Sequence, residues 1–403
     1  MRSYVEILRV RGVARIMSAQ LLARFPFGMI SLAFLLHIER LHDSYGAAGL
    51  VLAATSIGQA IAGPMTSRWM GVWGMRPVIV LTLIVCVASL SVIAFAPTLP
   101  VPVYMAVGFV GGISTPPIQP AVRTIYPKMV NSRQLTPLFS LDASAQEIIW
   151  VVGPVVATFV ATQISTMLAI AVAIVCLAVG GVWFLSSPEL GRVRIPRSKR
   201  RFGAILFRPP VLLATATGFL LVGACAAIEA GVVASFGHDS PNSGIVLAIF
   251  SVGSLIGGLA LGHVPIGPWA LARRMLIVFG GMALAAASLD FWWLSLALFI
   301  AGIGIAPALA VMFAIISASV KFSETAEAYG WVGTGQLIGA AIGSAVAGFM
   351  IDAYDAPGAI WVAIAFALAG FIVPTVFRRA HPDLRGRDAS PLPDTEPVQT
   401  LRP

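Results

Sequence analysis

Apolar stretches follow one another from residue 14 to residue 378, separated by short turns rich in charge, proline and glycine. A helix of roughly 20 apolar residues crosses about 30 Å of hydrocarbon. Lipid offers no hydrogen-bond partners, so helices with internal backbone bonds are the form that such stretches take. With 58% hydrophobic and 11% charged residues, the chain cannot cover itself with a water-facing surface. We therefore expect an all-α membrane protein.

The stretches predict twelve transmembrane helices, each of roughly 20 residues. They lie at 14–38, 46–67, 77–97, 102–125, 137–161 and 166–186, and then at 211–236, 243–263, 273–290, 291–320, 326–351 and 358–378. We expect an N-terminal six-helix bundle over 1–186 and a C-terminal six-helix bundle over 211–378. A basic linker over 187–210 joins them, and a tail over 379–403 is expected to be disordered.

The positions of the positive charges predict the orientation. If the N-terminus is cytoplasmic, all but two of the 26 Lys and Arg residues fall on the cytoplasmic side, and the exceptions are Arg24 and Arg40. This asymmetry is the positive-inside rule. It predicts a multi-pass protein of the cell (inner or plasma) membrane with both termini in the cytoplasm. The charges form no single patch, so we expect contact with the lipid bilayer and not with nucleic acid.

An internal repeat relates the two halves. The segment GLVLAATSIGQAIAG at 49–63 matches GIVLAIFSVGSLIGG at 244–258 without gaps, with eight of fifteen residues identical and each 195 positions before its twin. A weaker echo links GGISTPP at 111–117 with GIGIAPA at 302–308. Both indicate two pseudo-symmetric halves, as in transporters that move around a site near the middle of the membrane.

Two six-span halves, a long basic connector and this repeat resemble the major facilitator superfamily over about residues 13–378. The turn GPMTSRWMGVWGMRPVIV resembles the superfamily's loop between helices 2 and 3, in which Gly, Asp and Arg residues lock neighbouring helices at the cytoplasmic face. Gly74, Arg76 and Arg68 match this motif. Gly71 and Val72 stand where the family usually has Asp followed by Arg, so the usual charge relay is not expected.

The pair Gly153-Pro154 in the fifth span resembles the core of the antiporter signature in drug-exporting members of the superfamily. The alternative is a kink that serves only helix packing. The segments PPIQPAVRTIYPKMV and LDASAQEIIWVVGP also resemble bacterial members described as exporters.

Four ionisable residues lie inside predicted spans: Arg24, Asp142, Glu147 and Glu229. Each costs about 2.5–3.5 kcal/mol at the bilayer centre on insertion scales, so each needs a partner or a water-filled cavity. Arg24 and Glu147 lie at similar depth, about ten residues into their spans, and we expect them to pair. The pair either exchanges its proton or its partner during transport or locks two helices statically.

The other candidates have less central roles. Asp142 and Arg123 lie near the cytoplasmic ends of their spans and are expected to form a pair that closes the inner face. The alternative is that Asp142 belongs to the pathway of the proton or solute. Glu229 is a candidate proton or solute contact. Trp150, beside the candidate cavity helices, either stacks on an aromatic or lipophilic solute or packs in the core.

No phosphate-binding loop and no nucleophile–base constellation occurs in the sequence, so we expect neither an ATP-driven pump nor an enzyme. The three cysteines lack CxxC spacing, the five histidines do not cluster, and no metal or cofactor is expected. The sequence favours a monomeric secondary transporter that works by alternating access and exports a small lipophilic or amphipathic compound in exchange for protons. The alternatives are an uptake symporter or facilitator for a polar metabolite, or a receptor or scaffold that transports nothing.

Overall fold

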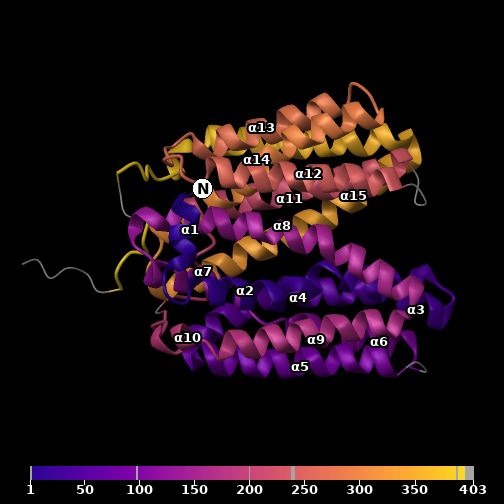
Figure 1. Ribbon diagram of the computed structural model, residues 1–403, viewed down its shortest axis with the longest axis horizontal. Helices are drawn as coiled ribbons and strands as arrows, with labels where there is room; N and C mark the ends of the chain where they lie inside the picture. The colour runs from indigo at the N-terminus through magenta and orange to yellow at the C-terminus, as the bar shows by residue number, and fades with distance from the viewer. Residues whose placement is uncertain (1, 97–98, 199, 237–240, 387–388, 395–403) are drawn as a thin grey trace, which may run out of the picture.

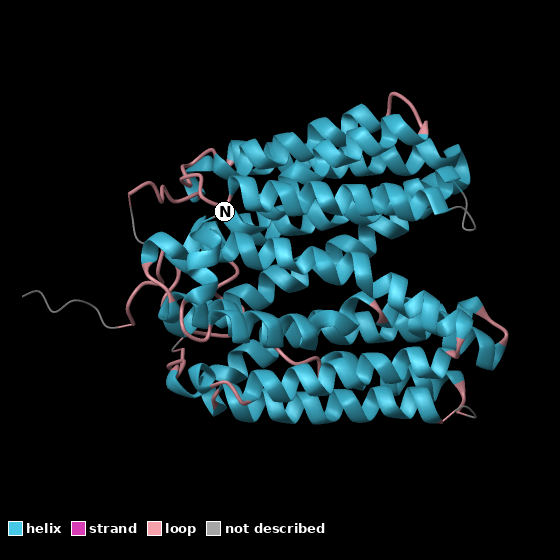
Figure 2. Cartoon of the chain, viewed as in Figure 1, coloured by secondary structure: helices cyan, strands magenta, loops and turns pink. Residues whose placement is uncertain are grey.

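The computed structural model describes residues 2–96, 99–198, 200–236, 241–386 and 389–394. Within these ranges every named element is a helix, and one isolated β-bridge joins Lys321 to Leu392. Figure 2 shows the long parallel helices and the short loops that connect them at both ends. The expected all-α fold is confirmed.

The N-terminal half begins with the short helix α1 (Arg2–Arg9) and contains six crossings. They are α2 (Val13–Arg24) with η1 (Phe25–Gly28) and α3 (Ile30–His42), α4 (Tyr45–Trp73), α5 (Met75–Phe95), α6 (Val101–Ile113) with α7 (Ile118–Met129), α8 (Ser132–Gln163) and α9 (Thr166–Leu185). The first and fourth crossings are interrupted, where the sequence predicted continuous helices. Pro26 lies in the first interruption and Pro116 and Pro117 in the second, and proline removes a helical hydrogen bond.

The linker holds α10 (Pro188–Arg192), and the C-terminal half follows. It comprises α11 (Pro209–Phe236), α12 (Pro241–Leu261), α13 (Ala270–Ala285), α14 (Phe291–Ser319), α15 (Phe322–Val376) and η2 (Arg378–Ala380). The 55 residues of α15 would extend about 80 Å as one helix, far more than a bilayer is thick. The helix reverses at Asp355, whose φ of 55° and ψ of −158° are not helical.

Ten segments of the described chain are long and apolar enough to span a membrane. The reversal at Asp355 makes α15 two crossings, and α13, with 16 residues, is too short for that criterion but runs beside α14 and α15. Together these segments account for the twelve predicted crossings.

Glycine contacts place the repeat at matching positions in the two halves. A Cβ atom on Gly112 of α6 would lie 2.1 Å from the Thr55 carbonyl oxygen of α4, and one on Gly302 of α14 would lie 2.2 Å from the Phe250 carbonyl oxygen of α12. Thr55 and Phe250 are 195 positions apart, the spacing of the repeat. The weaker echo is therefore real but one residue out of register, because Gly112 and not Gly111 corresponds to Gly302.

We expect Gly112→Ala to destabilise the N-terminal half, because the added methyl group would meet backbone atoms that cannot move aside locally. Overpacking of this kind typically costs about 1–3 kcal/mol. Gly49→Ala is the matched control, since a Cβ atom there would meet nothing within 4 Å. The measurement is the thermal unfolding midpoint of the purified proteins. Equal midpoints for the two variants would show that α4 and α6 are not packed as described.

In the part of the chain that the structure describes, the two halves come together toward one end of the molecule. Figure 1 shows the helices of the C-terminal half stacked above those of the N-terminal half, joined at the left end and diverging toward the right. The hydrophobic core agrees with this view. One cluster of buried residues runs through the C-terminal half and into the left end of the N-terminal half, whereas the right end of the N-terminal half, around Phe34, Leu90 and Tyr104, forms a separate cluster.

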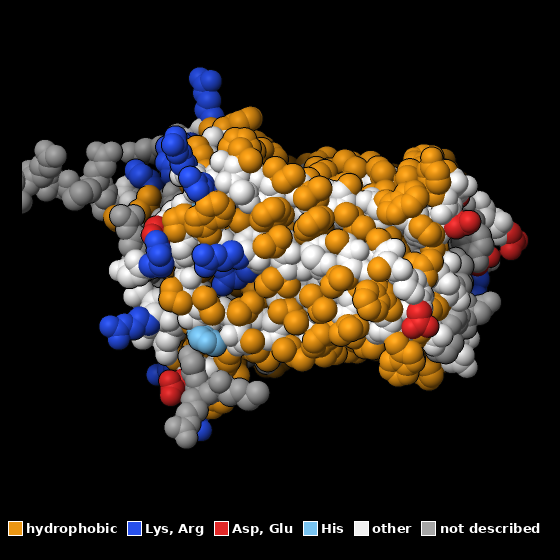
Figure 3. Space-filling view, turned by 90° about the horizontal axis from the view of Figure 1, so that it is seen from above, with side chains coloured by type: hydrophobic (Ala, Val, Ile, Leu, Met, Phe, Trp, Pro, Cys, Tyr) orange, Lys and Arg blue, Asp and Glu red, His pale blue; other side chains and the backbone are white. Residues whose placement is uncertain are grey.

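We call the joined end the basic end, because Arg9, Arg76, Arg192, Arg273 and Arg378 lie at helix ends there. In Figure 3 the blue Lys and Arg side chains on the visible face gather at this end, and acidic side chains dominate at the other. The apolar surface between the two ends has the extent of a membrane-facing band.

Among the helix pairs that join the halves, α4–α15 and α8–α12 each use one glycine of the repeat. In the α4–α15 seam, Gly63 lies against Gly330, and Thr334 donates a hydrogen bond of 2.6 Å to the Ala60 carbonyl oxygen. In the α8–α12 seam, Ser140 donates a hydrogen bond of 2.5 Å to the carbonyl oxygen of Gly258, the twin of Gly63. The halves therefore touch through symmetry-related positions.

The tail differs from the expected disorder in its described part. The Leu384 amide donates to the Ile266 carbonyl oxygen, and backbone hydrogen bonds join Leu392 to Val320 and Phe322 at the start of α15. His381 is buried, and this burial lowers the pKa of its imidazole. Residues 378–386 and 389–394 thus lie against the turns of the C-terminal half at the basic end.

Candidate functional site

Buried polar side chains from α2, α7 and α8 converge in the N-terminal half. Gln20, Arg24, Arg123, Tyr126 and Asp142 are each at most 4% exposed. Charged groups this deep in an apolar region are costly unless other groups satisfy them, so their partners decide what the cluster can do.

Asp142 is the centre of the cluster and is fully satisfied. Its Oδ1 accepts hydrogen bonds from Gln20 Nε2 at 2.9 Å and from the Tyr126 hydroxyl at 3.1 Å. Its Oδ2 accepts from Arg123 Nε at 3.1 Å. The predicted Arg123–Asp142 pair is confirmed. The Cζ atom of Arg123 lies 3.4 Å from the ring centroid of Phe313, which α14 contributes from the C-terminal half.

The predicted Arg24–Glu147 pair is not formed. Arg24 donates instead to Gln20 Oε1 at 2.8 Å and to Gln146 Oε1 at 2.5 Å. Arg24 does lie at the depth of Glu147 along α8, because its partner Gln146 is the residue directly before Glu147. The prediction was wrong about which side chain of α8 points toward Arg24, since successive side chains of a helix point about 100° apart. Among the described residues, no carboxylate lies within 4 Å of the Arg24 guanidinium, and its Nε has no hydrogen-bond partner.

Glu147 faces the other half of the molecule. Ser254 Oγ of α12 donates a hydrogen bond of 2.9 Å to Glu147 Oε1 and itself accepts one of 3.2 Å from the Ala306 amide of α14. Glu229 of α11 is exposed and lies close enough for electrostatic interaction with Glu147. Two carboxylates, one from each half, thus lie near enough for their charges to interact, and among the described residues neither has a basic partner within 4 Å.

Ion pairs close the basic end, and sequence reasoning missed their acidic partners. Arg68 of α4 pairs with Glu327 of α15 at 2.8 Å, and Glu327 also accepts from the Gly203 amide of the linker at 2.8 Å. Linker residues Arg200 and Arg208 pair with Glu324 at 2.8 Å and 3.7 Å. The spacing of Glu324 and Glu327 could have indicated a shared basic surface, because residues three apart lie on one face of a helix.

The remaining residues of the loop motif have local roles. Gly74 separates α4 from α5 with a φ of 92°, a left-handed conformation that favours glycine. Arg76 Nη2 donates to the Ser187 carbonyl oxygen at 3.3 Å. The acid that pairs with Arg68 therefore comes from the other half of the molecule and not from the loop, whose motif lacks the usual aspartate.

Gly153 has a clear packing role. A Cβ atom on Gly153 would lie 2.8 Å from the Cα of Gly28, so α8 crosses the η1 turn at backbone contact. Pro154 follows within α8, and Trp150, one turn earlier, is 51% exposed. The structure brings Gly153 and Pro154 against the interrupted first crossing. It places Trp150 in neither the charged cluster nor the core.

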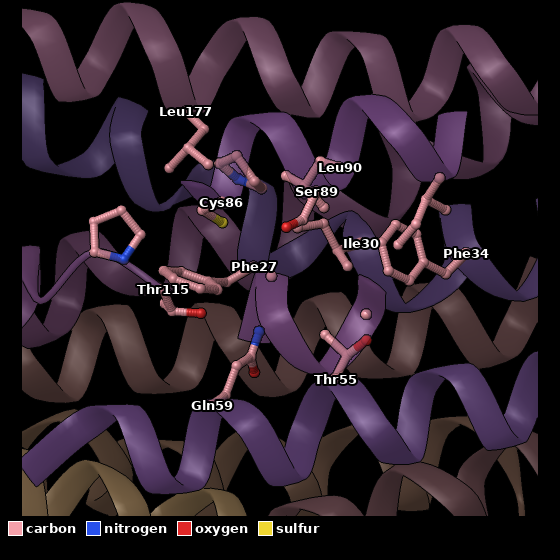
Figure 4. Close-up of a pocket in the computed structure, with 15 residues that line it drawn as sticks. Phe27, Ile30, Phe34, Thr55, Gln59, Cys86, Ser89, Leu90, Thr115 and Leu177 are labelled. Carbon is pink, nitrogen blue, oxygen red and sulfur yellow. The ribbon is translucent and has the colours of Figure 1, made fainter. Parts of the chain in front are cut away.

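One small cavity lies inside the N-terminal half (Figure 4). Side chains of Phe27, Ile30, Gln59 and Cys86 border it, and its volume of about 20 Å³ holds roughly one water molecule. It is lined by residues of η1, α3, α4, α5, α6 and α9 and of the turn after α6, all in the N-terminal half. We do not assign it to a solute path.

Comparison with solved structures supports the fold. The structure of the human organic anion transporter MFSD10 (TETRAN) has a TM-score of 0.69 and 17% identity, covering 90% of this chain and 99% of that one. A bacterial homologue of the iron transporter ferroportin, in an outward-facing state, has a TM-score of 0.73 and 12% identity, covering 92% and 100%. The proton:xylose symporter XylE has a TM-score of 0.67 and 14% identity, covering 94% and 97%.

No curated protein sequence matches the chain. The sequence profile of the Major Facilitator Superfamily, however, matches residues 16–289 and 230–401. Profile, helix count, repeat and structural neighbours agree, and they make the protein a multi-pass membrane transporter. The chain belongs to the Major Facilitator Superfamily.

Proposed function

We propose that this transporter is a proton-coupled exporter of a small amphipathic compound that works by alternating access. The observation that carries the proposal is the Glu147 carboxylate, which one hydrogen bond links to Ser254 across the α8–α12 seam. It is titratable, lies at the contact between the halves, and is near enough to a second carboxylate, Glu229, for their charges to interact. A proton that binds there acts directly on an inter-half contact.

The hydrogen bond gives the coupling a direction. Ser254 Oγ accepts from the Ala306 amide, so its single proton is directed to Glu147. A hydrogen bond to an ionised carboxylate is roughly twice as strong as one to a neutral acid. Protonation of Glu147 therefore weakens the α8–α12 seam. That seam must separate before the basic end can open, so a proton taken up in this conformation favours opening there.

The orientation completes the scheme. We propose that the basic end faces the cytoplasm of a cell membrane, as the positive-inside rule requires. The conformation described is then closed to the cytoplasm, and a proton enters from outside while solute leaves. We propose that the protein acts as a monomer, with residues 1–186 and 211–378 as its two moving bodies and with the linker 187–210 and the tail 379–403 in the cytoplasm.

The experiment is uptake of lipophilic and amphipathic dyes into inverted vesicles with an imposed proton gradient. We expect Glu147→Gln to reduce gradient-driven accumulation at least about tenfold, because general proton-transfer roles are commonly worth that much or more. Asp352→Asn, an exposed acid at the other end of the molecule, is the matched control and should transport normally. Accumulation by Glu147→Gln at the wild-type rate, with intact gradient dependence, would reject the coupling role. If the dye accumulates only in right-side-out vesicles, the protein is an uptake transporter and not an exporter.

A further inference from the structure

The charged cluster of the N-terminal half carries one uncompensated positive charge. It contains two guanidinium groups, Arg24 and Arg123, and one carboxylate, Asp142. Asp142 is already occupied by Arg123, Gln20 and Tyr126. Arg24, only 4% exposed, has amide oxygens as its side-chain partners and leaves its Nε unpaired. A buried cation that is solvated only by neutral groups is a strong site for an anion.

Neutral oxygens occupy the positions where an anion would bind. Gln146 Oε1 accepts from Arg24 Nη2 at 2.5 Å and from Arg123 Nη2 at 3.4 Å, so it bridges the two guanidinium groups. With the Gln119 amide in the orientation that its neighbours favour, its oxygen does the same, at 3.2 Å from Arg24 and 2.7 Å from Arg123. Both glutamines are only partly buried and can move aside.

We propose that Arg24 and Arg123 bind the anionic group, a carboxylate or sulfonate, of an amphipathic organic anion, in place of the Gln146 amide oxygen. The inference rests on the proposed transport function and names its substrate class. The site adjoins the moving parts, because the Phe313 ring against Arg123 belongs to the other half. Gln146 also precedes Glu147 in the chain, so an anion that displaces the Gln146 side chain acts next to the proposed proton carrier.

The test is binding of three dansyl probes that share a fluorophore and differ in charge: dansylglycine, dansylamide and dansylcadaverine. Energy transfer from tryptophan reports binding to the purified full-length protein in nanodiscs. We expect the wild type to bind the anion at least about tenfold more tightly than the neutral probe, and the cation most weakly. Arg24→Gln should reduce dansylglycine affinity to that of dansylamide without changing dansylamide affinity. Arg24→Lys should retain part of the preference.

Two further variants separate binding from folding. Gln146→Glu places a carboxylate between the guanidinium groups, so we expect normal or increased thermal stability together with loss of dansylglycine binding. Arg274→Gln is the control, since Arg274 is also buried but, among the described residues, donates only to the Ala270 and Leu261 carbonyl oxygens. It should keep the anion preference.

The inference is overturned if the wild type binds all three probes equally, prefers the cation or binds none. It is also overturned if folded Gln146→Glu protein retains the anion preference. Its failure is distinct from failure of the proposed function. Loss of proton coupling with an intact anion preference would reject only the export mechanism, whereas gradient-driven transport of cations would reject only the anion site.

Discussion

Replacement of Asp142 by Asn should greatly reduce the fraction of the protein that is folded. The amide keeps the shape of the side chain but removes the only carboxylate that Arg123 contacts among the described residues, and leaves two buried guanidinium groups with no acid beside them. Removal of one partner from a buried ion pair costs about 3–5 kcal/mol. That is a large share of the stability of a typical domain, about 5–15 kcal/mol.

Thermal unfolding and the yield of monodisperse protein in detergent measure this effect. The double variant Asp142→Asn with Arg123→Gln should recover part of the loss, because it restores the net charge of the cluster to that of the wild type. Asp352→Asn, exposed at the end opposite the linker, is the control for loss of an acid as such. If Asp142→Asn unfolds within about 2 °C of the wild type, the cluster is not an electrostatic unit.

The second large effect is expected at the α4–α15 seam. A Cβ atom on Gly330 would lie 2.5 Å from the Gly63 carbonyl oxygen, so a leucine there cannot fit while the basic end is closed. We expect Gly330→Leu to fold, because the halves can separate at this point. Transport should fall at least about tenfold, since the closed state is no longer accessible and one half of the alternating cycle is blocked.

Gly333→Leu is a close control for this prediction. It changes the same helix one turn later, where a Cβ atom would meet nothing within 4 Å. Dye transport in inverted vesicles and the accessibility of the basic end to a thiol reagent, with a cysteine at position 60, distinguish the two variants. The packing argument is wrong if both variants transport equally well, or if both fail.

Sequence alone predicted the fold well, because membrane spans are set by length and hydropathy. The span boundaries at 291–320 and 326–351 and the reversal after residue 351 agree with α14 and α15. The repeat predicted the internal symmetry, and glycines such as Gly112 and Gly302 now show why small residues recur there: two helices touch at backbone distance.

The site was only partly predictable, because depth along a helix is read from sequence more easily than direction around it. Asp142 and Arg123 paired as predicted, since both lie near span ends on adjoining helices. Arg24 did not reach Glu147, because the face of α8 that it meets carries Gln146. Neutral side chains such as Gln146 carry no charge signal, and only their position between two arginines makes them informative.

The two seams between the halves differ in chemistry, although their glycines are symmetry-related. The α4–α15 seam ends in the Arg68–Glu327 pair at the basic end, where Arg68 is 22% exposed and dissolved salt screens it over about 8 Å. The α8–α12 seam contains the hydrogen bond from Ser254 to the Glu147 carboxylate, which we propose that protons weaken. Under the proposed function, ionic strength and acidity act on different seams of one interface, so a single molecule would respond separately to the composition of the cytoplasm and to the energisation of its membrane.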